Sequence, residues 1–226
     1  MEVINFTDSS IFEDLSDEIF PEKLIETIRS FVAVENIYKS AIREIVTKLE
    51  NLNDEFKYTK DRNPIHQIKS RVKSPKSIIE KLKRKGFEVS VESARRNLND
   101  IAGIRVICSY IDDIYTIADL LISQDDIEVI KIIDYIKNPK PNGYRSLHLI
   151  VKVPVFLTKG IEYVKAEIQI RTIAMDFWAT LEHQLAYKIG RNYPEEIAAE
   201  LKACADVIAD TDLRMQKLYN KIKNGK

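Results

Sequence analysis

Two acids and one polar strand face carry the chemistry that this sequence suggests. In the run E-I-Q-I-R, alternation places Glu167, Gln169 and Arg171 on one face of a strand and both isoleucines on the other. Asp100 stands directly before an apolar run, so we expect its carboxylate at an end of the sheet, where ligands often bind. Two such acids could share Mg²⁺, which takes carboxylate and phosphate oxygens. A solvent-facing edge strand and a turn cap would account for the same residues without a site.

The loop P-K-P-N-G-Y-R-S-L-H at 139–148 is a second candidate. Two prolines stiffen it, and Gly143 permits a positive φ. Tyr144, Ser146 and His148 share the parity of a strand, so one face offers an aromatic ring, a hydroxyl and an imidazole. This face could stack on a base. A proline-rich hairpin whose tyrosine packs on the core explains the loop equally well.

Basic residues precede a predicted helix start at Ser74-Pro75. Arg71 and Lys73 lie where free backbone N–H groups and the helix dipole favour phosphate, and Ser77 and Lys81 follow one turn apart. No G-x-x-x-x-G-K-[ST] loop, no zinc-ligand spacing and no G-x-S-x-G elbow occurs. A P-loop enzyme, a zinc site and a serine hydrolase are therefore not expected.

The elements that must position these residues follow from apolar spacing and from turn residues. We expect a long helix from Pro21 to residue 52, or two with a break near 34–37, and a short basic helix from Ser74 to Gly86. Strand-like runs at 101–108, 127–133, 146–153 and 161–170 and helices at 112–123, 172–189 and 195–222 complete the pattern. The chain is thus predicted to be a single α+β domain with a central sheet and helical extensions.

Composition bounds the class of protein. The 226 residues are 45% hydrophobic, enough for a core, and 31% charged, with no uninterrupted apolar run of membrane-spanning length. The acidic start does not resemble a signal peptide, so we expect a cytoplasmic protein with no membrane partner. The 35 basic residues balance 35 acidic ones, which argues against a DNA-binding protein, but bases outnumber acids in residues 60–85, which suits a polyanionic ligand.

Five blocks in order make the sequence similar to a known family. It resembles the synthetase domain of the RelA/SpoT alarmone enzymes, and in size the small alarmone synthetases, through R-V-K-S-P-K-S-I-I-E-K-L (71–82), D-I-A-G-I-R-V (100–106), P-K-P-N-G-Y-R-S-L-H (139–148), E-I-Q-I-R-T (167–172) and W-A-T-L-E-H-Q-L-A-Y-K (178–188). The resemblance implies transfer of the β,γ-pyrophosphate of ATP to the 3′-hydroxyl of GTP or GDP, with AMP released. It also implies a mixed five-stranded sheet of the nucleotidyltransferase type at 65–190, with helical extensions at 1–64 and 191–226.

The resemblance assigns roles residue by residue. Asp100 and Glu167 match the acids that hold Mg²⁺, and Glu167 also matches the group that activates the 3′-hydroxyl. Two arginines match the pair that sandwiches adenine, and basic and hydroxyl residues match those that bind the ATP phosphates: Arg71 and Arg105 for adenine, and Lys73, Ser77, Lys81 and Arg84 for the phosphates. On the acceptor side, Tyr144 matches the residue that stacks on guanine, and the others around the nucleotide are Lys140, Asn142, His148, Gln169 and Ala179. Regular alternation would place Asp100 and Arg105 on opposite faces, so either Asp100 precedes the strand or a bulge intervenes.

The sequence also departs from the family pattern. Ile133 stands where a basic residue usually reaches the acceptor phosphates, which leaves the choice between GDP and GTP open. Gln67–Ser70 replaces an F-x-T-G that accompanies activation by pppGpp, so we expect the type without that activation. The chain has no His-Asp pair, so no hydrolase activity is expected. The resemblance suggests a homotetramer. The alternative is a regulator that binds nucleotides or single-stranded RNA through the basic segment and Tyr144.

Overall fold

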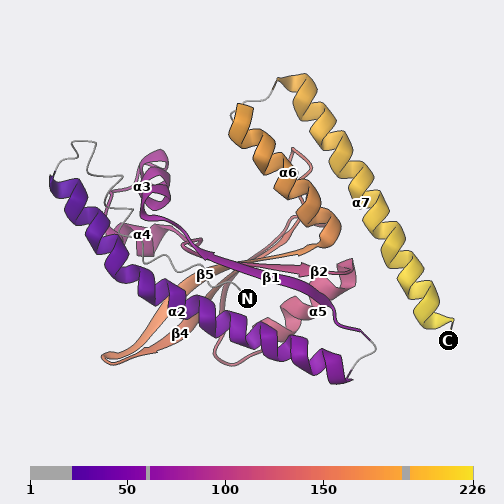
Figure 1. The fold of residues 1–226 in the computed structure, drawn as a ribbon, viewed down its shortest axis with the longest axis horizontal. Helices are drawn as coiled ribbons and strands as arrows, with labels where there is room; N and C mark the ends of the chain where they lie inside the picture. The colour runs from indigo at the N-terminus through magenta and orange to yellow at the C-terminus, as the bar shows by residue number, and fades with distance from the viewer. Residues whose placement is uncertain (1–21, 60–61, 190–193, 226) are drawn as a thin grey trace. The chain divides into compact units, whose positions relative to one another are not determined.

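The structure, a computed structural model, describes residues 22–59, 62–189 and 194–225 (Figure 1). The chain divides into two compact units. The first comprises Met1–Asn36 and Ser74–Leu98, and the second comprises Ile37–Lys73 and Asn99–Lys226. The second unit contains the whole sheet and most of the predicted site. The predicted partition at residues 64 and 190 stays a prediction.

Five strands form one mixed sheet in the order β1-β2-β5-β4-β3. Strand β2 runs parallel to β5, and the other three neighbouring pairs are antiparallel. The strands are β1 (Ile65–Val72), β2 (Ala102–Cys108), β3 (Glu128–Asp134), β4 (Leu147–Leu157) and β5 (Gly160–Thr172). Because β2 and β3 run in the same direction with α5 (Ile111–Ile122) between them, the predicted strand, crossover helix and strand are confirmed. The α+β fold class with a mixed five-stranded sheet is confirmed as well.

Strand register brings the predicted site residues onto one face. Arg105 on β2 pairs with Lys69 on β1 and with Gln169 on β5, and Gln169 pairs in turn with His148 on β4. A second row, two residues along, pairs Gly103 with Arg71 and with Glu167. Since alternate residues of a strand share a face, both rows point the same way. The predicted alignment of Glu167, Gln169 and Arg171 therefore belongs to a polar surface that crosses the sheet.

The opposite face of the sheet is the core of the second unit. On β2 and β5, the residues that alternate with the site residues are almost fully buried, among them Ile104, Val106, Ile168 and Ile170. Helices α2 (Glu22–Thr59) and α5 supply further apolar side chains without exposed surface: Ile45, Leu49, Ile114, Ile117 and Leu121. The packed face holds the strands in register and so fixes the spacing of the polar residues on the other face.

Of the two options for the first helix, the single long helix is confirmed, since α2 continues without a break through residues 34–37. Two features of the sheet differ from the expectation. Strand β1 was not predicted, because it lies at an edge of the sheet and only Ile65 of its eight residues is buried. Strand β4 continues through Pro154 to Leu157, although we expected it to end before the proline. β3 pairs with β4 only as far as Lys152, so the missing N–H of Pro154 interrupts no ladder on that side.

The first unit contains the predicted basic helix and a short helix that was not predicted, α4 (Val91–Asn97). Helix α3 (Pro75–Arg84) begins as expected, with Pro75 in its first turn and the Ser74 hydroxyl accepting a hydrogen bond from the backbone N–H of Ser77 at 3.3 Å. Gly86 follows the helix with a φ of 72°. The spacing of Ile78, Ile79 and Leu82 predicts that they face inward, and all three are buried.

Helices α6 (Ile173–Ile189) and α7 (Glu195–Asn224) lie side by side at the C-terminal end of the chain (Figure 1). Trp178 and Ala205 pack together between them, and the Trp178 indole donates a hydrogen bond to the carbonyl of Leu201 at 2.9 Å. The helical spacing of Trp178, Leu181, Leu185 and Ile189 favours a core-facing stripe, and this expectation is wrong for Leu181 and Leu185, which are about 40% exposed. The side chain of Ile189 lies outside the described residues, and so do residues 192–193 of the segment Asn192–Pro194, which predicts a break between the two helices.

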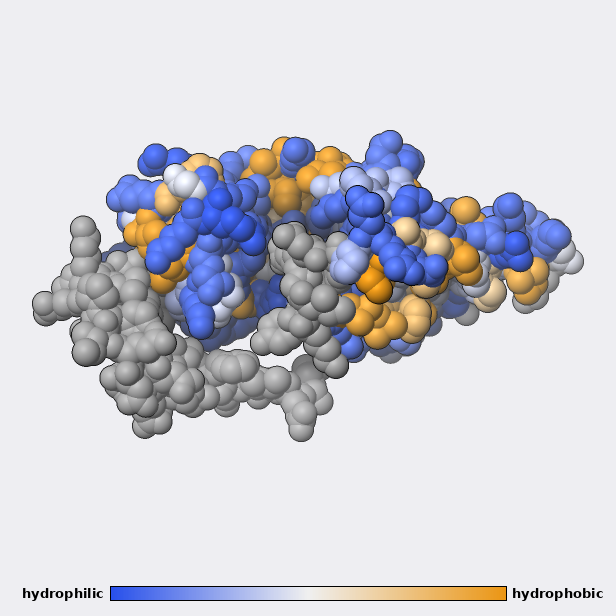
Figure 2. All heavy atoms as spheres, turned by 90° about the horizontal axis from the view of Figure 1, so that it is seen from above, coloured by the Kyte–Doolittle hydropathy of each residue, from blue (hydrophilic) through white to orange (hydrophobic). Residues whose placement is uncertain are grey.

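Apolar side chains remain exposed on both helices, and Figure 2 shows hydrophobic surface among hydrophilic residues toward the right-hand end of the view, where α7 runs. They are Ile173, Phe177, Leu181 and Leu185 on α6, and Ile197, Val207, Leu213, Met215, Leu218 and Ile222 on α7. Among the described residues, no helix combines the length and the apolar character that crossing a membrane requires.

Candidate active site

A pocket of about 210 Å³ opens on the polar face of the sheet. Five of the predicted residues line it together, namely Arg71, Asp100, Arg105, Glu167 and Gln169, and the remaining lining residues are Lys69, Ser70, Gly103 and Ile104. Gly103 pairs with both Arg71 and Glu167, so the row between the arginine and the acid carries no side chain. The floor of the pocket is therefore open between them.

Asp100 precedes β2 by two residues, which resolves the parity problem with Arg105. Its carboxylate comes from the turn into the strand, so strand alternation does not govern its direction. The backbone N–H of Lys73 donates to the carbonyl of Ile101 at 2.8 Å. The Lys73 ammonium then lies 2.6 Å from an oxygen of Asp100, and both side chains are mostly buried. The predicted phosphate-binding lysine and the predicted metal ligand thus lie in direct contact.

Glu167 accepts hydrogen bonds from two neighbours on the same face. Nε2 of Gln169 lies 2.9 Å from one carboxylate oxygen, and Nδ1 of His148 lies 3.3 Å from the other. Burial alone would raise the pKa of Glu167, but the bonds from His148 and Gln169 outweigh it and hold that pKa below its ordinary value. The carboxylate is therefore ionised at neutral pH, as both a metal ligand and a proton acceptor must be.

We call residues 139–148, which we predict to bind the acceptor nucleotide, the acceptor loop, and a row of hydrogen bonds connects this loop to Glu167. The Tyr144 hydroxyl lies 2.8 Å from Nε2 of His148 and accepts from a guanidinium nitrogen of Arg171 at 2.7 Å. Arg171 also donates to the side-chain oxygen of Gln169 at 2.8 Å. A neutral imidazole with its proton on Nδ1 satisfies these contacts, since Nε2 then accepts from Tyr144 while Nδ1 donates to Glu167. The structure therefore links the predicted guanine-stacking residue to the predicted catalytic acid.

Other predicted acceptor residues surround Tyr144. The Lys140 ammonium lies 4.7 Å from the centre of its ring, and the Asn142 side chain accepts a hydrogen bond from its backbone N–H at 3.2 Å. Ala179 is buried in the cluster of Trp178 and Ala205, against which Tyr144 packs. The Ser146 hydroxyl is fully buried and donates to the carbonyl of Ile170, so it cannot belong to the binding face suggested by its parity.

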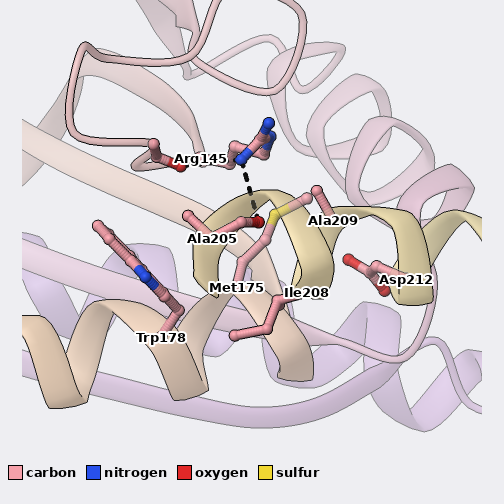
Figure 3. A pocket seen from close by; sticks show the side chains of 8 residues that line it. Arg145, Met175, Trp178, Ala205, Ile208, Ala209 and Asp212 are labelled. Atoms are coloured by element: carbon pink, nitrogen blue, oxygen red, sulfur yellow. Dashed lines mark hydrogen bonds between the residues drawn. The ribbon is translucent and has the colours of Figure 1, made fainter. Parts of the chain in front are cut away.

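Helix α7 packs against this loop, and Arg145 of the loop contacts Ala205 of the helix (Figure 3). Gly143 has a φ of 88°, and a Cβ placed on it would lie 2.5 Å from the Cβ of Ala205. The neighbouring Arg145 donates to the carbonyls of Gly143 and Ala205 and to the carboxylate of Asp206. Glycine at 143 is thus required both by backbone conformation and by close approach to the helix.

One further residue, Asp176, completes the polar network. Asp176 on α6 contacts Arg105 and Arg171, and it lies outside the strand alternation from which we predicted the site. An excess of positive charge could have indicated this residue, because Lys69, Arg105 and Arg171 share one face and partly buried cations need a neighbouring acid.

Ser77, Lys81 and Arg84 lie on α3 in the first unit, and their role stays a prediction.

The donor set can be compared with the needs of Mg²⁺. Among residues 22–59, 62–189 and 194–225, no group of three or more His, Cys, Asp or Glu could hold a metal ion. Asp100 and Glu167 line one pocket, and the charge of Asp100 acts on the pKa of Glu167. Two carboxylates suit Mg²⁺, which usually keeps waters and substrate phosphates as its other ligands.

Known proteins share both this sequence and this fold. The family described as "Region found in RelA / SpoT proteins" matches residues 70–192. GTP pyrophosphokinase YwaC of Bacillus subtilis is 49% identical over 79% of this chain and 85% of its own length, and GTP pyrophosphokinase YjbM of the same organism is 36% identical over 82% and 87%. The crystal structure of B. subtilis small alarmone synthetase 1 bound to its product pppGpp superposes with a TM-score of 0.81 at 34% identity, covering 86% of this chain and 99% of that one. The chain therefore belongs to the RelA/SpoT family.

Proposed function

We propose that the chain is a (p)ppGpp synthetase, which transfers the β,γ-pyrophosphate of ATP to the 3′-hydroxyl of GTP or GDP and releases AMP. The observation that carries the proposal is the pocket that joins Asp100 and an ionised Glu167 to Arg71 and Arg105. Relatives named GTP pyrophosphokinase at 49% and 36% identity support it. The chemistry needs positioned phosphates, neutralised charge and a proton acceptor, and this pocket offers all three.

In the reaction, the 3′-oxygen of the acceptor forms a bond to the β-phosphorus of ATP while the bond from that phosphorus to the α,β-bridging oxygen breaks. AMP leaves with the bridging oxygen, and Glu167 takes the proton of the 3′-hydroxyl as the new bond forms. Asp100 and Glu167 would hold Mg²⁺, which supplies neutralisation of the phosphate charge when bound. Lys73, 2.6 Å from Asp100, would add a further positive charge beside the phosphates.

The two nucleotides are assigned to opposite sides of Glu167. Adenine would lie between the guanidinium planes of Arg71 and Arg105, which stack on rings as lysine cannot. The resemblance assigns its phosphates to Lys73 and, on α3, to Ser77, Lys81 and Arg84. Guanine would stack on Tyr144, with Lys140, Asn142, His148, Gln169 and Ala179 around the acceptor. Support for this half comes from the contacts that connect Tyr144, His148 and Glu167.

The proposal includes a homotetramer and a cytoplasmic location. Exposed apolar residues along α6 and α7 offer a surface that association would cover, and size-exclusion chromatography with light scattering tests the oligomeric state. ATP and guanine nucleotides are cytoplasmic substrates, which supports the location. RNA binding stays a prediction from the basic segment, tested by titration of labelled single-stranded RNA at physiological salt.

A transfer assay tests the function. Purified protein is incubated with Mg²⁺, γ-labelled ATP and either GDP or GTP, and labelled nucleotides and AMP are separated. We expect label to move to the guanine nucleotide in step with AMP formation, without later loss of label, since no hydrolysis is expected. Absence of transfer to both acceptors would overturn the proposal, and RNA binding without AMP formation would favour the regulator.

A further inference from the structure

We propose that Asp176 is a positioning residue for both nucleotide sites, because it holds Arg105 on the ATP side and Arg171 on the acceptor side with one carboxylate. This inference rests on the proposed function, which assigns the two sides. One oxygen of Asp176 lies 3.1 Å from Nη1 of Arg105 and 3.2 Å from Nη1 of Arg171. The Lys69 ammonium lies 3.8 Å from the other oxygen.

The backbone fixes Asp176 in place. Strand β5 ends at Thr172, whose hydroxyl accepts a hydrogen bond from the backbone N–H of Met175 at 3.1 Å and so ties the start of α6 to the strand. Asp176 lies in the first turn of α6, where the helix dipole favours a negative charge. Its side chain is only 11% exposed. The carboxylate is therefore held at the end of the polar sheet face.

Charge balance makes this carboxylate necessary. Arg171 is 4% exposed, and Arg105 lies close enough for the two guanidinium charges to oppose each other. Burial lowers the pKa of Arg105, the charge of Arg171 lowers it further, and Asp176 acts in the opposite direction. Without the acid, two like charges would share a partly buried space, and at least one would turn toward water.

The effect of Asp176 extends beyond its direct contacts. Arg171 donates to the Tyr144 hydroxyl and to Gln169, so its position sets the orientation of the ring proposed to stack on guanine. Arg105 lines the pocket on the other side and presents the guanidinium plane proposed for adenine. A single charge thus orients one residue at each nucleotide, although Asp176 itself does not line the pocket.

The test is Asp176→Asn, which keeps the size of the side chain and removes its charge. Affinities for a non-hydrolysable ATP analogue and for GDP are measured separately by calorimetry, and KM and kcat are measured for both substrates. We expect each affinity to fall roughly tenfold or more, and Asp176→Glu to restore part of both. Asp210→Asn is the matched control, since Asp210 is 59% exposed and pairs with Arg214 on its own helix.

Unchanged affinities, or loss at only one nucleotide, would overturn the shared role. A variant that unfolds at a lower temperature but binds both nucleotides as the wild type does would show a structural role alone and would also overturn it. These outcomes differ from failure of the proposed function, in which the wild-type protein itself transfers no pyrophosphate.

Discussion

His148 and Glu167 face each other diagonally across β4 and β5, with Nδ1 of the imidazole 3.3 Å from a carboxylate oxygen. Register explains the contact, because His148 pairs with Gln169 and Glu167 pairs with Ile150, two residues along on the same face. The bond helps to hold the pKa of Glu167 low against the opposing effect of burial. The histidine that we assign to the acceptor therefore also favours the ionised form of Glu167, the proposed proton acceptor.

Replacing this histidine is expected to shift the pH dependence of the reaction. His148→Ala removes the hydrogen bond that lowers the pKa of Glu167. Burial still raises that pKa, so we expect it to be higher in the variant. Because the reaction needs the ionised form, the acidic limb of the kcat profile, measured at saturating acceptor, moves to higher pH. His66→Ala is the control, since His66 is exposed on β1. An acidic limb at the same pH in both variants would contradict the contact.

The contact between the acceptor loop and α7 predicts that a substitution there changes the binding of one substrate, the guanine nucleotide. In Gly143→Ala, the new methyl would lie 2.5 Å from Ala205 Cβ, so the loop must move. We expect KM for GDP or GTP to rise several-fold, on the order of 1–2 kcal/mol of lost binding, with KM for ATP much less affected. Ala205→Gly in the same chain should recover part of the loss.

The control for this change is Gly86→Ala. Gly86 has a similar φ of 72°, but a Cβ there meets nothing within 4 Å. It should cost only the backbone strain, about 1 kcal/mol of stability, without an acceptor-specific effect. Equal effects of the two substitutions on the acceptor KM would show that contact with α7 is not what matters.

Prediction from sequence succeeded where a residue pattern is fixed by local geometry. Alternation in β5 correctly placed Glu167 and Gln169 on one face. The apolar run of β2 correctly predicted a strand, and its parallel pairing with β5 brings Arg105 beside Gln169. Helix α3 was recognised because Ser74 and Gly86 mark its ends.

The parts that failed depend on tertiary contacts. β1 is mostly exposed, so its sequence lacks an apolar alternation, and its pairing with β2 is what makes it a strand. Asp176 follows the end of β5 on a helix, and only the folded chain brings it to Arg105, 71 residues away in sequence. The placement of α7 against Gly143 likewise has no local signal.

Asp212 is expected to make the free energy of unfolding depend on pH. It is buried on α7, where burial raises its pKa and the hydrogen bond from the Thr172 hydroxyl opposes this only in part. The folded state therefore binds this proton more tightly than the unfolded state, so the group's contribution falls as pH rises from the ordinary range of an aspartate through the raised pKa.

In Asp212→Asn, the oxygen that accepts from Thr172 remains and the charge is absent. We expect the free energy of unfolding to depend less on pH in the mildly acidic range and not to fall at neutral pH. Urea unfolding at several pH values measures this, with exposed Asp210→Asn for comparison. A marked loss of stability at neutral pH would mean that the charge of Asp212 is itself stabilising.

Arg62, which precedes β1, joins α5 and α7 and should be important for stability. Its guanidinium donates to both oxygens of Asp113 at 2.8 and 2.6 Å and lies 4.7 and 4.3 Å from the rings of Tyr110 and Tyr219. Arg62→Lys keeps the charge but loses the paired hydrogen bonds and the flat contact with the rings, so we expect a loss of about 1–3 kcal/mol. Urea unfolding checks this. Arg214→Lys should change little, because that pair is exposed, and an equal loss in both variants would contradict the special role of Arg62.

The most direct test of the proposed chemistry is Glu167→Gln, with Glu128→Gln as the control because Glu128 is exposed and its carboxylate pairs with Lys152. AMP release and label transfer from γ-labelled ATP are measured beside binding of a non-hydrolysable ATP analogue. We predict that Glu167→Gln lowers turnover by about a hundredfold or more while the folded protein still binds the analogue, and that Glu128→Gln behaves as the wild type. Turnover near the wild-type rate in Glu167→Gln would contradict the role of Glu167 and with it the proposed mechanism.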